Sequence, residues 1–512
     1  MKLILDGEQL NMKDVWAVAQ NRKSSVQLAP ESKKKMEHSR TYIEKQMDEG
    51  LTVYGVNTGF GYLSQTKIDK KDIVQLQKNL IRSHSVGIGD PFTEEETRSI
   101  MLLRANALAR GHSGIRTLVV EKILEFLNED VIPVIPQKGS VGASGDLAPL
   151  SHLALALIGE GQVWIDGKPG ETAPYLQKKN IQPLELQAKE GLSLINGCQV
   201  MTGVGLLNAY RAQRICALAD LAGAMTLEAL HGSRTPFDPQ ITASRPHPGE
   251  AKTARNLLKF LSPESEIARG HADCDKVQDA YSLRCMPAVH GAVKDTLKFV
   301  LEKLEIEANS STDNPLVFSE SEKIVSCGNF HGMPIAFSLD YLAISLTALS
   351  SISERRIEKL INPALSGLPA FLTKNGGLNS GYMIVHVAAA SLVSENKVLS
   401  HPASVDSIPT SADKEDHVSM GTIAARKLTQ ILKNTKTVVA MELMAACQGL
   451  DFSRPQKSTK MIEAVYALIR KKVPYAENDR NFSLDIKEVL ELIENDELYQ
   501  LLIKEHPDIE IL

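Results

Sequence analysis

The spacing of apolar residues along the chain predicts a protein built mainly of helices. Apolar positions recur every three or four residues, which is the period of a helix with one buried face. The pattern predicts helices over residues 72–84, 94–110, 114–129, 147–158, 197–231, 252–260, 287–307, 332–361, 383–399, 417–449 and 457–471, with a last one beginning near 485. Several are long and mostly apolar, which is typical of helices buried in a bundle.

Strand-like patterns are largely confined to the first 200 residues. Residues 2–13 and 161–171 alternate around Asp-Gly pairs, which favour β-hairpins. Residues 233–250 are rich in proline and predict an extended loop. We therefore predict a mixed N-terminal domain over residues 1–200 and a bundle of long helices, with further C-terminal helices, over residues 201–512.

The composition adds limits on compartment and partners. Hydrophobic residues make up 43% of the 512 residues and charged residues 23%, which is typical of a soluble globular protein. The net charge of −5, with acids and bases interspersed, disfavours a nucleic-acid or polybasic membrane surface. Residues 333–353 carry one charge, Asp340, but resemble neighbouring segments, so we expect a buried helix and no membrane span. The opening residues suggest no secretory signal, and we expect a cytoplasmic protein.

The six cysteines are scattered, and we expect free thiols; they are Cys198, Cys216, Cys274, Cys285, Cys327 and Cys447. Two pairs, His271 with Cys274 and Cys327 with His331, have separations that metal ligands tolerate. Neither pair is joined by a second one at the spacing of a zinc site. The sequence therefore predicts no metal centre.

Three small residues in a row, Ala143, Ser144 and Gly145, stand between Gly142 and Asp146. In a tightly bent loop, the unhindered nitrogen of Gly145 can attack the carbonyl carbon of Ala143 and close a five-membered ring. Loss of one water from the ring and one from the Ser144 side chain leaves an exocyclic methylidene, a strong electrophile. By itself such a run is typical of a tight turn before a helix. A serine hydrolase is disfavoured, because its G-x-S-x-G motif requires glycine where Asp146 stands.

Two further polar residues stand where a side chain can be displayed. Tyr54 lies in a segment, residues 51–61, with three glycines that mark an irregular loop and without the Lys-Ser/Thr of a phosphate-binding loop. A displayed and a buried tyrosine are both compatible with this segment. His84 ends the predicted helix over residues 72–84, where an imidazole is also an ordinary partner of the helix dipole.

Five positions further along carry groups that bind or support a substrate. Asn196 lies between an apolar run and a glycine, so it is either a structural bridge or a hydrogen-bond donor to a bound group. Gln278, Tyr281 and Arg284 follow one another at steps of three, which predicts a shared helical face. The guanidinium of Arg284 matches a carboxylate, although an ordinary salt bridge is the alternative. Phe330, considered alone, is typical of a side chain buried in the core.

The string VGASGDLAPLSH resembles the signature of the aromatic amino acid ammonia-lyase family. The resemblance extends from the Tyr54 region to at least residue 450, and around this string stand, in the family's order, the motifs GVNTGFG, NLIRSHSVG, GLSLINGCQ, QDAYSLRCMP, NSSTDNPL, GNFHG and PTSADKEDHVSMGT. Many ordered motifs are far more specific than one. The resemblance implies an ammonia-lyase/fumarase-like helical fold and a homotetramer with each site built from several subunits.

The resemblance also implies roles for the residues. Ala143, Ser144 and Gly145 would cyclise to 4-methylideneimidazol-5-one (MIO), with no external cofactor. Asn196 would donate to this ring, and Phe330 would pack near it. In the third group, Arg284 would bind the substrate carboxylate, Tyr281 would support the catalytic group and Gln278 would contact the substrate.

The substrate follows from two positions. The phenylalanine- and tyrosine-specific members usually carry Phe-Leu or His-Leu where this chain has Ser83-His84, and Gln where it has Glu415. An imidazole ring needs hydrogen-bond partners, which His84 and Glu415 supply, whereas a carboxylate facing a phenyl ring would be desolvated without a partner. Asp413-Lys414, in place of the usual Asn-Gln, departs from the histidine-specific pattern, as does a cysteine at 198 where threonine is common.

We therefore expect deamination of L-histidine to trans-urocanate and ammonia. The electrophile would engage the α-amino group, with attack by the imidazole ring as the competing route. Tyr54 is the preferred base for the β-proton, provided that its pKa is lowered, and Tyr281 and Glu415 are the alternatives. A tyrosine or phenylalanine ammonia-lyase or aminomutase is the nearest rival. A non-catalytic helical scaffold is a further rival, but it has no use for residues 143–145.

Overall fold

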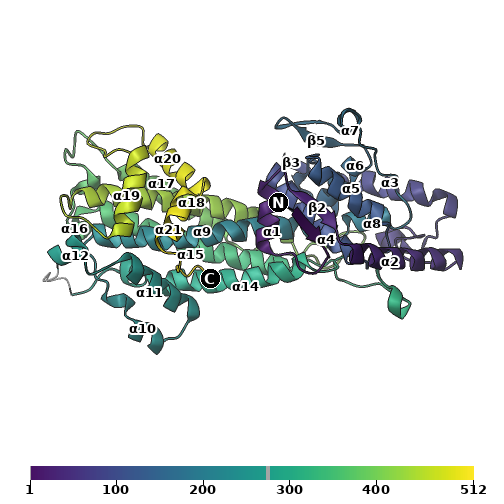
Figure 1. Ribbon diagram of the computed structural model, residues 1–512, viewed down its shortest axis with the longest axis horizontal. Coiled ribbons are helices and arrows are strands. Elements are labelled where there is room, and N and C mark those ends of the chain that lie inside the picture. Colours follow the sequence, from purple (N-terminus) through teal and green to yellow (C-terminus); the bar gives the residue numbers. More distant parts are fainter. Residues whose placement is uncertain (1, 272–276) are drawn as a thin grey trace. The chain divides into compact units, whose positions relative to one another are not determined.

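The computed structural model describes residues 2–271 and 277–512 and contains two compact units (Figure 1). Unit 1 comprises residues 1–210, 300–340 and 402–427, and unit 2 comprises residues 211–299, 341–401 and 428–512. Compact units need not be independent domains, so the predicted division into residues 1–200 and 201–512 stays a prediction.

Helices account for most of both units, which confirms the predicted mainly helical fold. Those within unit 1 are α1 (Met12–Gln20), α2 (Pro30–Asp48), α3 (Ile73–His84), α4 (Glu94–Ala109), α5 (Thr117–Asn128), α6 (Leu147–Leu157), α7 (Thr172–Lys178) and α8 (Glu190–Ile195). Four long helices have residues in both units: α9 (Gln199–Ala229), α14 (Met286–Ala308), α15 (Met333–Ile361) and α18 (Gly421–Asp451). Those within unit 2 are α10 (Pro239–Ser244), α11 (Pro248–Phe260), α12 (Glu266–Gly270), α13 (Tyr281–Arg284), α16 (Pro363–Ser366), α17 (Met383–Leu399), α19 (Lys460–Lys472), α20 (Phe482–Glu494) and α21 (Glu497–Glu505).

The strands form two-stranded sheets in unit 1. They are β1 (Lys2–Leu5) with β2 (Ser25–Leu28), β3 (Ile88–Pro91) with β4 (Pro136–Lys138), β5 (Gln162–Ile165) with β6 (Lys168–Glu171), and β7 (Leu316–Phe318) with β8 (Lys323–Val325). The β5–β6 hairpin confirms the prediction for residues 161–171, with Asp166 and Gly167 at φ 49° and 75° in its turn.

The hairpin predicted over residues 2–13 is wrong. Strand β1 pairs in parallel with β2, and α1 lies between the two strands in sequence. The Asp6 carboxylate accepts hydrogen bonds from the backbone nitrogens of Glu8 and Gln9, at 2.8 and 3.0 Å. This local turn leads the chain into a helix instead of a returning strand, because parallel strands need a crossover between them.

The prediction of an extended loop over residues 233–250 is also wrong in part. Helix α10 lies inside this segment, and α11 begins within it. Proline is tolerated in the first turn of a helix, where a backbone N–H has no helical partner, and Pro239 and Pro248 occupy those positions.

The packing within unit 1 brings three helix ends together. Helix α4, buried along nearly its whole length, packs against α1 and α5. Helices α3, α6 and α8 pack against one another (Figure 1). The last residue of α3 is His84, α6 begins directly after Asp146, and Asn196 directly follows α8. The helix packing therefore gathers residues that are far apart in the sequence.

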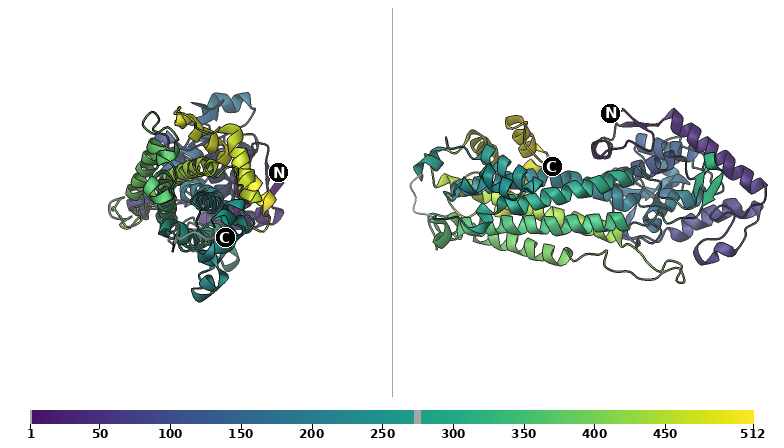
Figure 2. Two further views of the ribbon diagram at one scale, coloured as in Figure 1. Left: turned by 90° about the vertical axis from the view of Figure 1, so that its left-hand side faces the viewer. Right: turned by 90° about the horizontal axis from the view of Figure 1, so that it is seen from below.

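Within unit 2, segments of the four long helices run side by side (Figure 2). Arg356 on α15 donates to the Glu442 carboxylate on α18, at 2.5 and 2.8 Å. Asp220 on α9 accepts from Lys294 at 2.5 Å and lies 2.8 Å from a ring nitrogen of His290, both on α14. All five side chains are buried. Because a buried charge without a partner is costly, these pairs specify how the helices align.

One helix in the described part of the chain, α15, is long and apolar enough to cross a membrane by length and composition alone. Of its most apolar window, 61% is buried inside the protein. Such burial is expected for a core helix of a bundle, in agreement with the interpretation of residues 333–353.

Candidate active site

The loop between β4 and α6 is bent sharply around two glycines. Gly145 has a φ of +72°, and a Cβ atom there would lie 2.2 Å from the carbonyl oxygen of Gly197. The next backbone nitrogen, that of Asp146, donates to the same oxygen at 2.7 Å. Gly142 has a φ of +71°, and a Cβ atom there would lie 2.2 Å from the hydroxyl of Ser419. Only glycine fits at these two positions.

The carboxylate of Asp146 anchors this loop to the beginnings of two helices. It accepts hydrogen bonds from the backbone nitrogens of Val200 and Met201 in the first turn of α9, at 2.9 and 3.0 Å. It also accepts one from the hydroxyl of Thr422 in α18. Burial raises the pKa of Asp146 to about 6, against the lowering effect of these hydrogen bonds.

Two cavities meet at the loop, one of about 720 Å³ and one of about 400 Å³. Both are lined by His84, Ala143, Ser144, Leu147, Ser411 and Glu415. The larger one is also lined by Tyr54, Asn196 and Phe330, and the smaller one by Gly145. All the predicted site residues of unit 1 therefore line one continuous region.

Glu415 is held on both sides of its carboxylate. Its Oε1 accepts a hydrogen bond from the Ser144 hydroxyl at 3.2 Å, and its Oε2 accepts one from the Thr410 hydroxyl at 2.9 Å. The backbones of Thr410 and Glu415 also pair with each other, at 3.0 and 3.3 Å. Between them, residues 411–413 have φ values of 54°, 52° and 64°, the left-handed region that side chains disfavour. The contacts of Thr410 with Glu415 close this strained turn.

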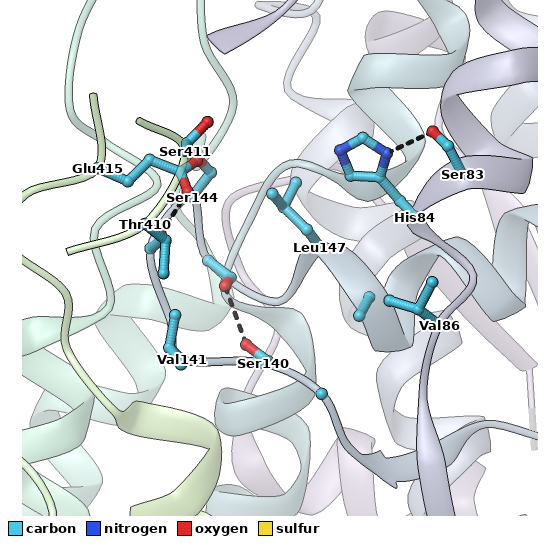
Figure 3. Close-up of a pocket in the computed structure, with 14 residues that line it drawn as sticks. Ser83, His84, Val86, Ser140, Val141, Ser144, Leu147, Thr410, Ser411 and Glu415 are labelled. Atoms are coloured by element: carbon cyan, nitrogen blue, oxygen red, sulfur yellow. Dashed lines mark hydrogen bonds between the residues drawn. The ribbon is translucent and has the colours of Figure 1, made fainter. Parts of the chain in front are cut away.

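His84 lies across the smaller cavity from Ser144 and Glu415, with Leu147 between them (Figure 3). Its Nδ1 lies 2.9 Å from the carbonyl oxygen of Leu80, an acceptor only, so the proton is assigned to Nδ1. Nε2 is then the free acceptor of the neutral ring. Burial lowers the pKa of His84, although the Leu80 contact and the charge of Glu415 raise it, and the ring is neutral at pH 7.

Tyr54 lies in a glycine-rich loop that packs closely against α8. A Cβ atom on Gly55, where φ is +72°, would lie 2.3 Å from the side chain of Leu192. The phenol oxygen accepts a long hydrogen bond, 3.5 Å, from the backbone nitrogen of Gly61. Burial raises the pKa of Tyr54, and the charge of Glu415 acts in the same direction. The hydrogen bond from Gly61 acts to lower this pKa but does not offset burial, so the lowered pKa that a base requires is not reached with these groups of unit 1.

Asn196 lines the larger cavity with only 2% of its surface exposed. Its Nδ2 donates to Oδ1 of Asp313 at 3.2 Å and to the carbonyl oxygen of Asn314 at 3.4 Å. Its Oδ1 is buried and has no hydrogen-bond donor in the part of the chain that the structure describes. The arrangement differs from the expectation that this amide donates to the prosthetic ring, because both N–H groups already bind within the protein.

Residues 10–471 match the family described as aromatic amino acid lyase. The chain belongs to this family. It is 50% identical over 497 residues to a histidine ammonia-lyase of Myxococcus xanthus, with 97% of each chain covered. Among solved structures, it is similar to histidine ammonia-lyase from Trypanosoma cruzi (44% identity, TM-score 0.92, 99% and 96% covered) and to tyrosine aminomutase from Streptomyces globisporus (40% identity, TM-score 0.94, 100% of both covered). The predicted ammonia-lyase fold is thereby confirmed.

The predicted trio Gln278, Tyr281 and Arg284 lies in unit 2 of this lyase, and the cavities within unit 1 are lined without it. The prediction that the three residues share a helical turn is wrong. Helix α13 begins only at Tyr281, because Ala280 is extended (φ −62°, ψ 158°) and leaves Gln278 outside it. The guanidinium of Arg284 lies 4.6 Å from the Tyr281 ring centre and donates to the carbonyl oxygen of Asp279. A three-residue step does not define a helix when the backbone between its members is extended.

The remaining expectations concern cysteines and metals. Cys198 donates to the carbonyl oxygen of Phe330 at 3.0 Å, which ties the start of α9 to the segment that lines the cavity. The cysteines that the structure describes are free thiols, and Cys274 lies outside the described residues. Among residues 2–271 and 277–512, no three His, Cys, Asp or Glu side chains gather as metal ligands.

Sequence reasoning missed Thr410 and Asp313, which contact predicted site residues. Both lie inside motifs of the family, PTSADKEDHVSMGT and NSSTDNPL. Motif membership was the available signal, but it does not say which side chain a residue contacts.

Proposed function

We propose that this chain is a histidine ammonia-lyase, which converts L-histidine to trans-urocanate and ammonia by non-oxidative deamination. The observation that carries the proposal is the placement of His84 and Glu415 around Ser144 in one cavity. Nε2 of neutral His84 and the Glu415 carboxylate are both acceptors, and a charged imidazole ring, with its two N–H groups, can donate to both. A phenyl ring would leave this carboxylate desolvated without a partner. The names of the relatives support the same substrate.

The prosthetic group in this proposal is MIO, formed from Ala143, Ser144 and Gly145, and no external cofactor is required. The residues fit that group. Gly145 lies against the backbone of Gly197, so the peptide is held tightly bent with an unhindered nitrogen, and Asp146 fixes the end of the bend. Once formed, the group supplies an electrophilic carbon that makes the substrate nitrogen a better leaving group.

The other residues bind the substrate and move its proton. The substrate engages the electrophile through its α-amino group, with the imidazole ring as the alternative. Tyr54 is the proposed base for the β-proton, and Glu415 and Tyr281 are the alternatives. A phenol base needs a positive charge nearby to lower its raised pKa, and Arg284 is a candidate source of it.

The trio of unit 2 has the remaining substrate roles in this proposal. Arg284 binds the substrate carboxylate, Tyr281 supports the catalytic group and Gln278 contacts the substrate. Phe330 packs near the electrophile. A planar guanidinium and a carboxylate form two parallel hydrogen bonds, which is the chemical basis of the role of Arg284.

We also propose a cytoplasmic homotetramer. Unit 2 exposes apolar side chains on two adjacent helices: Tyr341 and Ile344 on α15, and Ile384, Val387 and Val398 on α17. Their exposed fractions lie between 45% and 74%. The helices are joined by hydrogen bonds of Asn396, and large exposed apolar areas mark interaction surfaces. The resemblance to the family implies that each site of such a tetramer is built from several subunits.

The experiment is to incubate the purified protein with L-histidine, L-tyrosine and L-phenylalanine and to follow the ultraviolet absorbance of the unsaturated acids. The Ser144→Ala variant serves as the control for the electrophile. Urocanate from histidine alone, lost in the variant, is the expected result. Coumarate or cinnamate would refute the substrate while keeping the electrophile.

A tyrosine aminomutase is the second candidate, because a protein with that activity has the same fold at 40% identity. It differs by returning the amino group to the β-carbon. Formation of a β-amino acid from tyrosine, detected by mass spectrometry after chromatography, would favour it over histidine deamination.

A further inference from the structure

A buried ion pair lies directly behind Asn196. Nζ of Lys189 lies 2.7 Å from Oδ2 of Asp313, and the hydroxyl of Ser193 donates to the same oxygen at 2.8 Å. The other oxygen, Oδ1, accepts hydrogen bonds from the backbone nitrogen of Asn314 at 2.7 Å and from Nδ2 of Asn196 at 3.2 Å. The carboxylate is thus divided, with one oxygen for the ion pair and one for the amide that lines the cavity.

Asp313 is charged where it lies. Burial acts to raise its pKa, but the positive charges of Lys189 and Arg104 outweigh burial and hold the pKa of Asp313 below its ordinary value. Arg104 also donates to the carbonyl oxygens of Asn196 and Ser193, at 2.9 and 2.5 Å. The side chain and the backbone of Asn196 are therefore both fixed by buried charged groups.

These contacts leave the amide of Asn196 only one orientation. Both neighbours of its Nδ2, Oδ1 of Asp313 and the carbonyl oxygen of Asn314, are acceptors only. A flipped amide would set oxygen against oxygen. In the orientation observed, the other atom of the amide, Oδ1, is a buried acceptor that lacks a donor in the described chain. A buried polar atom without a partner is costly, and at a site it indicates that the ligand completes the bond.

We propose that Asp313, held by Lys189, is a positioning residue that presents Oδ1 of Asn196 as a hydrogen-bond acceptor to the α-amino group of the substrate. This inference rests on the proposed function. L-histidine brings two kinds of N–H donor, and its imidazole is assigned to His84 and Glu415. Its carboxylate offers no donor. The amino group, which is also the leaving group, is the donor that remains.

The first test uses two competitive ligands that each lack one group. L-histidinol keeps the amine without the carboxylate, and imidazole-4-propionate keeps the carboxylate without the amine. Asp313→Asn and Asn196→Ala are expected to raise the Ki of L-histidinol by about tenfold, the loss of one hydrogen bond. The Ki of imidazole-4-propionate is expected to change by less than about twofold. The opposite pattern would assign the amide to the carboxylate and overturn the proposal.

The second test is a double-mutant cycle on kcat/KM. Asp313→Asn is expected to lower kcat/KM in the native background and to have almost no further effect in Asn196→Ala, because it acts through that amide. If the fold-changes in kcat/KM of the two substitutions multiply in the double variant, Asp313 has a merely structural role and the proposal is refuted. Asp220→Asn, which also breaks a buried aspartate–lysine pair, is the matched control and should multiply with Asn196→Ala.

Two measurements separate a failure of this inference from a failure of the proposed function or of folding. Urocanate formation by the unmodified protein is measured first. If no urocanate forms, the proposed function is refuted, and the test says nothing against the role of Asp313 by itself. Thermal melts show whether each variant folds. If Asp313→Asn does not, Lys189→Met/Asp313→Asn takes its place in the cycle, because removing both buried charges is far less disruptive than removing one.

Discussion

Thr410→Val tests whether the strained turn before Glu415 is held for catalysis. Valine keeps the shape of threonine and removes its hydroxyl, which donates to Oε2 of Glu415 at 2.9 Å. The φ values of 54°, 52° and 64° over residues 411–413 place this carboxylate on a backbone that does not hold its conformation by itself. The Ser144 hydroxyl, the other donor to Glu415, leaves as water when MIO forms, so in the cyclised protein the variant removes the remaining hydroxyl contact of Glu415 that the structure describes.

The magnitude follows from the type of hydrogen bond. A hydrogen bond to a charged group contributes about 1.5–3 kcal/mol, which corresponds to roughly 10- to 150-fold in a rate constant. The paired backbones of Thr410 and Glu415 remain and keep the loop close to its place. We therefore expect the lower end, a fall of about tenfold in kcat/KM for L-histidine.

The assay is the initial rate of urocanate formation, with Thr410→Ser as the matched control. Serine keeps the hydroxyl and should retain most of the activity. Thermal melts of both variants separate a local effect from loss of the fold. Activity of Thr410→Val equal to that of the unmodified protein would refute the idea that this hydroxyl positions Glu415, and so would an equal loss in both variants.

Three other changes have defined outcomes. Gly145→Ala places a methyl group 2.2 Å from the carbonyl oxygen of Gly197. We therefore expect that this variant does not cyclise: its intact mass should still include both waters, and it should make no urocanate. Gly167→Ala, where a Cβ atom has nothing within 4 Å, is the control and should cyclise normally. Tyr54→Phe should lower kcat by about 10²- to 10⁴-fold with little change in KM if the phenol is the base; a small loss there beside a large one in Glu415→Gln would move that role to Glu415. Burial lowers the pKa of His290, so below about pH 6.5 this histidine is protonated in the unfolded chain but still neutral in the folded one, and the melting temperature should fall as the pH drops. His290→Gln should make the melting temperature depend less on pH. An unchanged dependence would contradict the lowered pKa of His290.

Local signals in the sequence determined most of the helices. Residues 383–399 were predicted as a helix and form α17 with the same ends, because the apolar period is a property of the segment itself. The hairpin around Asp166-Gly167 follows likewise from its turn residues. The same signal failed at residues 2–13, since the partner of β1 lies beyond α1 and pairing depends on what α1 packs against.

The chemistry divides in the same way. The sequence by itself determined the family and the residue types of the site, because ordered motifs such as VGASGDLAPLSH can be recognised without any knowledge of distances. Only the tertiary structure decided that the ends of α3, α6 and α8 meet, that Thr410 closes a strained turn onto Glu415, and that Asp313 fixes the orientation of Asn196. The physical reason is that a motif fixes which groups are available, whereas hydrogen bonds and burial depend on the backbone conformation of each segment and on how separate segments pack against one another.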